Sequence, residues 1–394
     1  MAATLPTARC CLEKEGKKMS IAGLIFSNIH DGSLPELTNR RTMASVPFGC
    51  RYRLIDFALS NMVNSGISNI GIVTHYNYQS LLDHIGMGTD WDLARRSGGI
   101  KILPPFITAY ANSAAGRVYG TRLEALMGVM NFISRAPEDY IVLSDCDVIC
   151  NMDVEDMVKF HESRGADITL AVKHIKAREH KLPRDAMLIR SEDGKVTGAE
   201  NYIGKEDEFD ISMNVMVVKR TLLHGLVLDA QAKGYSDFYR DIICKSLDDL
   251  TICAYEYEGY FSIVSSLAGY FESNMKLLES TSRNGLFSIE DRPVYTKVRN
   301  SPPTKYCEDA IVSGSLIADG CIIEGRVENS IIFRGVRVGK GSVVKNCILL
   351  QDTYVGDNVK LNCVISDKNV VIKDYRNLSG HPTVPFYIDK GLTI

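Results

Sequence analysis

The sequence has no apolar run approaching the ~20 residues that a helix needs to cross a bilayer. Its first residues, Met1–Lys18, lack the continuous apolar segment of a secretory signal and resemble a short polar extension. It also has no charge excess, because 45 lysines and arginines face 48 aspartates and glutamates. These absences argue against a membrane protein, a secreted protein and a nucleic-acid partner, so we expect a cytoplasmic chain.

The eleven cysteines are scattered and form no Cys-x-x-Cys pair. A chain of this size without a secretory signal most often keeps its thiols reduced. Cys146 and Cys150 have the spacing Cys-x-x-x-Cys, but no nearby histidine or second pair completes a zinc site. We therefore predict neither a disulfide framework nor a structural metal.

The composition is that of a folded protein, with 394 residues of which 45% are hydrophobic and 24% are charged. A disordered chain would have fewer apolar residues and a larger net charge. The length favours two domains, or one large domain with an appendage.

Roughly the first 290 residues alternate strand-like and helix-like segments, which favours an α/β domain with a mostly parallel sheet. The apolar patterns predict strands over Ile21–Phe26, Asn69–Thr74, Tyr140–Ser144 and Asp167–Lys173. Helical spacing predicts helices over Ile55–Ser65, Leu123–Ser134 and Val154–Arg164.

The pattern changes after Pro302-Pro303. Aliphatic doublets such as Ile322-Ile323, Ile331-Ile332 and Ile348-Leu349 recur there between small and polar residues. This is typical of a hexapeptide β-helix, in which each coil is three short strands. A run of β-hairpins is the alternative, but two-residue hairpin turns do not recur. We predict an extension at 1–18, an α/β domain at 19–299 and a β-helix at 300–394.

Several segments carry one family signature. The longest is Glu36–Gly66, and the shorter ones are His84-Ile85-Gly86 with Trp91-Asp92-Leu93, Tyr119-Gly120-Thr121, Ser236-Asp237-Phe238 and Tyr270–Asn274. Together they resemble the ADP-glucose pyrophosphorylases, which join glucose 1-phosphate to ATP and release pyrophosphate. The resemblance covers nearly the whole chain from Met19. It implies a Rossmann-like (GT-A-like) nucleotidyltransferase domain, a left-handed parallel β-helix and a tetramer.

The resemblance also shows which phosphate-binding groups are missing. The family's Gly-Gly-x-Gly-Thr-Arg-Leu loop corresponds to Asn28–Leu34, which retains one glycine. Asp31 places a negative charge beside the expected triphosphate, and Ser33 stands where the family has arginine. The lysine of the family's Ala-Lys-Pro-Ala-Val stretch corresponds to Met43. Both phosphate-binding cations are therefore expected to be absent.

Of the family's two metal-binding aspartates, one is retained. Asp147 corresponds to the first, and Ile263 stands in place of the second. A single carboxylate rarely organises Mg²⁺ against a triphosphate. Asp147 is thus either a residual metal ligand or a turn residue at the end of a strand. We expect Mg²⁺ to act only through a catalytic partner subunit.

The substrate pocket is partly retained. Five residues match its positions in the family and are expected to be vestigial: Tyr119, Gly120, Thr121, Ser212 and Asp237. The family's Glu-Lys-Pro motif is missing from Glu200–Lys205. Lys205 is either a substitute for the missing lysine or a solvated loop residue, and we favour the loop residue.

Four arginines lie close in the sequence: Arg40, Arg41, Arg51 and Arg53. In the family, basic residues of this region help to bind sugar-phosphate effectors. Arg51 and Arg53 flank Tyr52 at strand spacing, so we expect them to share a face. The alternative is an exposed basic strand without a ligand.

Three functions fit this pattern. The first is a catalytically impaired regulatory subunit, which joins an active subunit in a hetero-oligomer, most simply a tetramer. The second is an active nucleotidyltransferase in which residues such as His30 and Lys205 replace the lost groups. The third is a sugar-phosphate-binding scaffold without enzymatic activity, as a homo-oligomer or alone. We favour the first, because the core pattern is intact while the catalytic groups are lost together.

Overall fold

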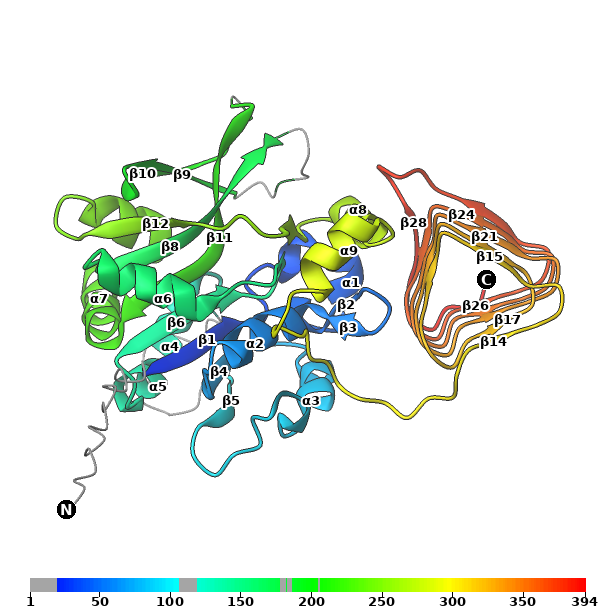
Figure 1. Cartoon of the computed structure of the whole chain (residues 1–394), viewed down its shortest axis with the longest axis horizontal. Helices are drawn as coiled ribbons and strands as arrows, with labels where there is room; N and C mark the ends of the chain where they lie inside the picture. The colour runs from blue at the N-terminus through cyan, green and yellow to red at the C-terminus, as the bar shows by residue number, and fades with distance from the viewer. Residues whose placement is uncertain (1–19, 106–118, 178–181, 183–185, 205) are drawn as a thin grey trace, which may run out of the picture.

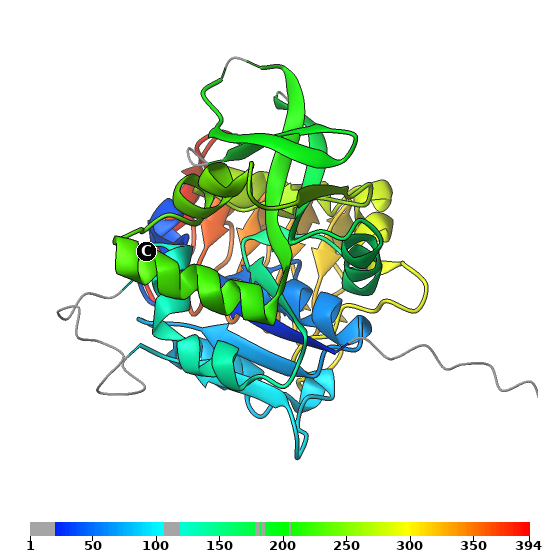
Figure 2. The same cartoon turned by 90° about the vertical axis from the view of Figure 1, so that its left-hand side faces the viewer.

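The computed structural model describes residues 20–105, 119–177, 182, 186–204 and 206–394. The predicted extension at Met1–Lys18 lies outside them. The described chain forms an α/β part followed by a triangular coil of strands, as Figure 1 shows. Figure 2, turned so that the α/β part faces the viewer, places the coil behind it.

The α/β part is built on a nine-stranded sheet. In spatial order its strands are β5 (Gly99–Leu103), β4 (Asn69–Val73), β1 (Ile21–Phe26), β6 (Tyr140–Asp145), β11 (Glu208–Lys219), β8 (Ile168–Lys176), β12 (Ile252–Glu256), β10 (Lys195–Asn201) and β9 (Met187–Glu192). Strands β5, β4, β1 and β6 are parallel, and β11 runs antiparallel to β6 and β8. Every residue of β1 is buried, because helices cover both faces of the sheet.

Helices pack on the two faces of the sheet, and their apolar side chains form two clusters with it. The helices are α1 (Pro35–Thr38), α2 (Leu54–Asn64), α3 (Gln79–Ile85), α4 (Arg122–Gly128), α5 (Met130–Arg135), α6 (Val154–Ser163), α7 (Arg220–Lys233), α8 (Leu267–Lys276) and α9 (Ser280–Phe287). Helices α2, α6 and α8 contribute to one cluster, and α4, α5 and α7 contribute to the other. Among the described residues, no helix is long and apolar enough to cross a membrane.

One helix prediction was wrong in a detail. The segment Leu123–Ser134 is not one helix, because α4 ends at Gly128 and α5 begins at Met130. Val129 between them has a φ of −115°, outside the helical range. The break follows a glycine, which favours the helical conformation least of the ordinary residues apart from proline.

Two short strand pairs complete the α/β part. Strand β2 (Pro47–Phe48) pairs with β3 (Tyr52–Arg53), and β7 (Val148–Ile149) pairs with β13 (Ser262–Ile263). Both pairs are antiparallel. The second pair places β13 next to the turn that follows β6.

The C-terminal part is a left-handed β-helix, as predicted. Its three parallel sheets are β14 (Lys305–Tyr306), β17 (Ile322–Ile323), β20 (Arg337–Val338), β23 (Tyr354–Val355) and β26 (Val371–Ile372); β15 (Ile311–Ser313), β18 (Arg326–Glu328), β21 (Val343–Lys345), β24 (Lys360–Asn362) and β27 (Asn377–Ser379); and β16 (Leu316–Ile317), β19 (Ile331–Ile332), β22 (Ile348–Leu349), β25 (Val364–Ser366) and β28 (Phe386–Ile388). Asparagines such as Asn329 and Asn346 take positive φ at the corners, a conformation that this residue type tolerates.

The aliphatic doublets are explained by burial on both faces of the third sheet. Ile331, Ile348 and Ile365 stack in register and belong to the same apolar cluster as α2 and α8 of the α/β part. Ile332 and Leu349, the second members of their doublets, lie in the cluster inside the coil. The β-helix therefore shares a continuous core with the α/β part.

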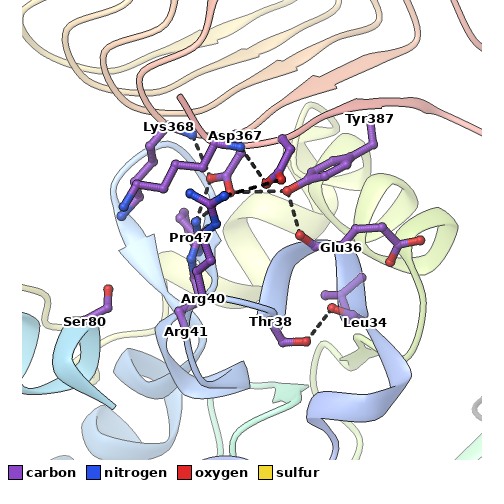
Figure 3. Close-up of polar contacts among 12 residues, drawn as sticks. Leu34, Glu36, Thr38, Arg40, Arg41, Pro47, Ser80, Asp367, Lys368 and Tyr387 are labelled. Atoms are coloured by element: carbon purple, nitrogen blue, oxygen red, sulfur yellow. Dashed lines mark hydrogen bonds and ion pairs between the residues drawn. The ribbon is translucent and has the colours of Figure 1, made fainter. Parts of the chain in front are cut away.

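Polar contacts reinforce this joint, as Figure 3 shows. Arg41, just after α1, donates from Nη2 to both carboxylate oxygens of Asp367 at 2.9 and 2.6 Å. Both residues are only 2% exposed. The Tyr387 hydroxyl on β28 donates to the carbonyl oxygen of Glu36 at 2.6 Å. The segment around α1 is thus held directly by the last coils of the β-helix.

Replacing Asp367 with asparagine should lower the free energy of unfolding by about 3–5 kcal/mol, because the buried Arg41 charge loses its partner. Urea denaturation followed by circular dichroism measures this loss. The matched control is Asp389→Asn, since Asp389 is exposed and lies 3.9 Å from the exposed Arg40. The control should change the unfolding free energy by less than about 1 kcal/mol. Equal losses in the two variants would contradict the prediction.

Candidate functional site

The candidate site lies where the loops after β1 and β6 meet. These two strands are parallel neighbours, so their carboxyl ends lie at the same edge of the sheet. In open α/β sheets this edge is where ligands bind. The loop after β1 contains the altered glycine segment, and the turn after β6 contains Asp147.

A buried cluster of opposite charges occupies this edge. Asp145 and Asp147 are both 2% exposed. The Nε2 atom of His30 lies 2.8 Å from Oδ2 of Asp145 and 3.8 Å from Oδ2 of Asp147. Arg122, the first residue of α4, donates to Asp145 from Nε at 3.3 Å and also from Nη2. We call these four residues the acidic centre.

The charges of the acidic centre stabilise one another. Burial lowers the pKa of His30, but the charges of Asp147 and Asp145 outweigh this effect and raise that pKa to about 9. Burial raises the pKa of Asp147 to about 6, with His30 opposing the rise. Burial also acts to raise the pKa of Asp145, but Arg122 and His30 hold it below its ordinary value. Near neutral pH two cationic side chains therefore face two carboxylates.

Ile263, which is predicted to stand at the position of the family's second metal-binding carboxylate, lies beside Asp147. It pairs with Val148 in the β7–β13 ladder, and the next residue, Val264, donates its backbone N–H to the carbonyl oxygen of Asp147 at 2.9 Å. The Ile263 side chain is buried and belongs to the apolar cluster. This position therefore presents hydrocarbon, and no oxygen, next to Asp147.

The altered loop is closed by contacts among its own replacements. The backbone N–H of Met43 donates to Oδ1 of Asp31 at 2.7 Å. Burial raises the pKa of Asp31 to about 7, although that hydrogen bond lowers it. Ser33 ends a short 3₁₀ turn, Asp31–Ser33, and Met43 is buried. No residue of this loop supplies a cation at the predicted lysine or arginine position.

The site does not fit the divalent metal that the family implies. The side chains of His30, Asp145 and Asp147 do place ligand-type atoms within 4.8 Å of one another. However, Asp145 is engaged by Arg122 and His30, and Ile263 offers no ligand atom. Oδ1 of Asp147 is buried and has no hydrogen-bond partner in the described chain. Mg²⁺ prefers several oxygen ligands in near-octahedral geometry, and this set does not provide them.

The residues of the Tyr119-Gly120-Thr121 segment support the loop and the start of α4. The Tyr119 hydroxyl donates to Oδ1 of Asn28 at 3.1 Å. Thr121 caps α4 by accepting the backbone N–H of Glu124 at 3.2 Å, and the Gly120 N–H donates to the Glu124 carboxylate at 2.8 Å. Their predicted role in binding substrate stays a prediction.

Ser212 and Asp237 lie on the other side of Arg122. Ser212, on β11, hydrogen-bonds the hydroxyl of Tyr239, whose ring centroid lies 5.7 Å from the guanidinium of Arg122. Asp237 accepts the backbone N–H of Arg240 at 2.7 Å, at the start of a π-helical turn. The structure thus brings Ser212 near the acidic centre through Tyr239. Lys205 lies outside the described residues.

The four arginines are separated by the structure. Arg40 is exposed and Arg41 is buried against Asp367. Arg51 is exposed with its guanidinium 5.7 Å from the ring centroid of Tyr52, whereas Arg53 is buried and donates to the Ser80 hydroxyl at 2.9 Å. The expected shared face of Arg51 and Arg53 is therefore wrong. The reason is that β3 ends at Arg53, which turns inward as the N-cap of α2.

Lys368 of the β-helix joins this basic group. Burial, together with the charges of Arg53 and Arg41, lowers the pKa of Lys368 to about 6. Figure 3 shows Lys368 beside Asp367, at the same joint as Arg41. Sequence reasoning missed Lys368 because it lies far along the chain from the arginines. It also missed Arg122 and Asp145, although Arg122 follows the Tyr-Gly-Thr motif directly and Asp145 stands two residues before Asp147.

Comparisons with known proteins agree with this architecture. Residues 33–182 match the nucleotidyl transferase family model, and residues 302–381 match the model of the GlmU-like C-terminal hexapeptide. The glycogen biosynthesis protein GlgD of Bacillus subtilis (strain 168) is 34% identical over 94% of this chain and 96% of its own length.

Glucose-1-phosphate adenylyltransferases are similar to this chain to about the same degree. The glucose-1-phosphate adenylyltransferase of Clostridium perfringens (strain SM101 / Type A) is 33% identical over 86% of each chain. That of Bacillus thuringiensis (strain Al Hakam) is 32% identical over 91% of this chain and 94% of its own length. The family predicted from the Glu36–Gly66 signature is thereby confirmed, and the chain belongs to the glucose-1-phosphate adenylyltransferases, also called ADP-glucose pyrophosphorylases.

Proposed function

We propose that the chain is a regulatory, catalytically impaired subunit of glucose-1-phosphate adenylyltransferase in glycogen biosynthesis. The observation that carries the proposal is the buried Ile263 beside Asp147, because it removes one of the two carboxylates that the reaction needs to hold Mg²⁺. The similarity to a protein named for glycogen biosynthesis supports the pathway. The reaction of the complete enzyme is ATP plus glucose 1-phosphate giving ADP-glucose and pyrophosphate.

The missing cations support the same proposal. Transfer of a nucleotidyl group develops negative charge that cations or metal ions must stabilise. At the predicted positions this chain has Ser33 and the buried Met43, and Asp31 adds a carboxyl group. Because the lost groups belong to one constellation while the core remains packed, a role within a complex is favoured over general decay.

The partner that we propose is an active paralogous subunit in a cytoplasmic hetero-oligomer, most simply a tetramer. Exposed apolar residues on the outer face of the β-helix support an interface. Tyr354 and Val371 stack on neighbouring coils and are 42% and 37% exposed. Contiguous apolar groups on a surface often mark a protein–protein contact.

We further propose that a sugar-phosphate effector binds at the joint of the two parts. Arg40, Arg41 and Arg53 concentrate positive charge there, and Asp367 neutralises only part of it. Lys368 lies beside them, and their charges help to lower its pKa. Phosphate groups favour such clusters, because guanidinium groups bind them through paired hydrogen bonds. Arg51 lies apart, over the Tyr52 ring, and its place in the effector site stays a prediction.

Co-expression with a catalytic glucose-1-phosphate adenylyltransferase subunit from the same source tests the proposed function. We expect the two chains to co-elute and the mixture to form ADP-glucose faster, or with a different effector response, than the catalytic subunit alone. The chain alone should show no comparable turnover with Mg²⁺. Absence of both co-elution and any change in activity would refute the regulatory role, and full turnover by the chain alone would favour the active enzyme.

Restoring the lost groups together should recover some activity in the isolated chain. The variant combines Asp31→Gly, Ser33→Arg, Met43→Lys and Ile263→Asp, and it is measured with and without His30→Gln, because the imidazole lies at the carboxylates that Mg²⁺ must reach. Single substitutions should not rescue activity, because groups that act as one unit are strongly non-additive. The measurement is pyrophosphate release with Mg²⁺, ATP and glucose 1-phosphate. Rescue by Ile263→Asp alone would show that one carboxylate was the whole defect.

Lys368 should make the stability of the chain depend on pH. Because its pKa falls from 10.5 to about 6 on folding, the unfolded chain binds more protons between these values. Stability should therefore rise with pH from 6 to 9 in the wild type relative to Lys368→Met. Thermal unfolding at several pH values measures this difference. The control Lys340→Met, at an exposed position of the β-helix, should keep the wild-type profile.

A further inference from the structure

Two buried carboxylates remain at a site that does not fit the family's metal. Removing a carboxylate from water is costly unless a cation or hydrogen bonds compensate it. Here the described chain brings two side-chain cations to the same place, one from the loop after β1 and one from α4.

We propose that His30 and Arg122 form a built-in cation pair, which takes the place of the divalent metal and excludes Mg²⁺ and Mn²⁺ from the acidic centre. This inference deepens the proposed function but is independent of any partner, since it concerns what the isolated chain binds.

The position of His30 carries the first part of the inference. Its Nε2 atom lies 2.8 Å from one carboxylate and 3.8 Å from the other. A metal ion bridging Asp145 and Asp147 would need to occupy this same space at about 2.1 Å from the oxygens. The imidazole nitrogen therefore lies at the carboxylate oxygens that such a metal ion would need.

Arg122 carries the second part. It makes two hydrogen bonds to Asp145, a paired geometry that holds a carboxylate firmly. Its guanidinium also lies between the rings of Phe26 and Tyr239, at 5.8 and 5.7 Å, so its position is fixed by packing. Asp145 is consequently committed to Arg122, and His30 is the cation that reaches Asp147.

The same three side chains could in principle hold a transition-metal ion, with the imidazole as a ligand rather than a competitor. The commitment of Asp145 to Arg122 argues against this arrangement. The two arrangements give opposite results on removal of His30, because a competitor blocks the metal and a ligand holds it. The variant at this position therefore decides between them.

The experiment is a Mn²⁺ titration of the full-length chain, with free Mn²⁺ measured by electron paramagnetic resonance, followed by the same titration with Zn²⁺ by calorimetry. His30→Ala should bind one Mn²⁺ about tenfold or more tightly than the wild type, the size of effect expected when a group next to a metal site is changed. Adding Asp147→Asn to His30→Ala should abolish the gain. His75→Ala, at a half-buried histidine near Tyr119, is the matched control and should behave as the wild type.

Two further variants keep the test decisive if His30→Ala unfolds. His30→Lys retains a cation and should still exclude Mn²⁺, whereas His30→Gln retains bulk without charge and should gain binding. Circular dichroism checks that each variant is folded. Equal Mn²⁺ affinity in the wild type and His30→Gln, or Zn²⁺ binding that is lost on removal of His30, would overturn the inference.

The outcome is separable from that of the proposed function. A chain that gains metal binding without His30 but never co-elutes with a catalytic subunit supports the built-in cation pair and refutes the regulatory role. A chain that co-elutes and regulates but already binds Mn²⁺ in the wild type refutes the built-in cation pair alone.

Discussion

The joint between the β-helix and the α/β part is the constraint on which the rest of the structure depends. The isoleucines on the outer face of the third β-helix sheet are buried in the core of the α/β part, and the Arg41–Asp367 pair closes its polar edge. The chain segment that contains α1 and Arg41 begins at the altered loop of the candidate site. The Thr38 hydroxyl donates to the carbonyl oxygen of Asp31 at 2.7 Å, and Glu36 accepts from Tyr387. The altered loop and the β-helix are therefore connected through α1.

At the candidate site, the side chains at the predicted catalytic positions are accommodated by their neighbours. Ile263 extends the apolar cluster, and the Asp31 carboxyl accepts the N–H of Met43. His30 compensates the aspartates that a metal would otherwise compensate. Such contacts with neighbouring side chains show how a site can change its polar groups and keep a packed fold.

Local sequence patterns predicted the helices and strands more accurately than they predicted the contacts between distant side chains. Both ends of strand β1 were predicted correctly, because a short apolar run between polar residues forms a buried strand in such a sheet. The doublets of the β-helix were recognised from their spacing. The break at Val129 was not foreseen, because apolar spacing continues across it. The burial of Arg41 could not be read locally, since its partner Asp367 lies on another domain. Lys368 and Arg122 were missed for the same reason, because a charge cluster assembled from distant segments leaves no local motif.

The shared core of the two parts has a consequence for how the chain unfolds. A β-helix whose outer sheet is covered by its neighbour cannot separate without exposing a row of isoleucines to water, and the α/β part would lose the same cover. The two parts differ in architecture, yet they share one apolar core. Thermal unfolding should consequently be one cooperative transition that includes both parts. A chain cut between α9 and β14 would yield two fragments that expose apolar surface and aggregate, rather than two independently folded domains.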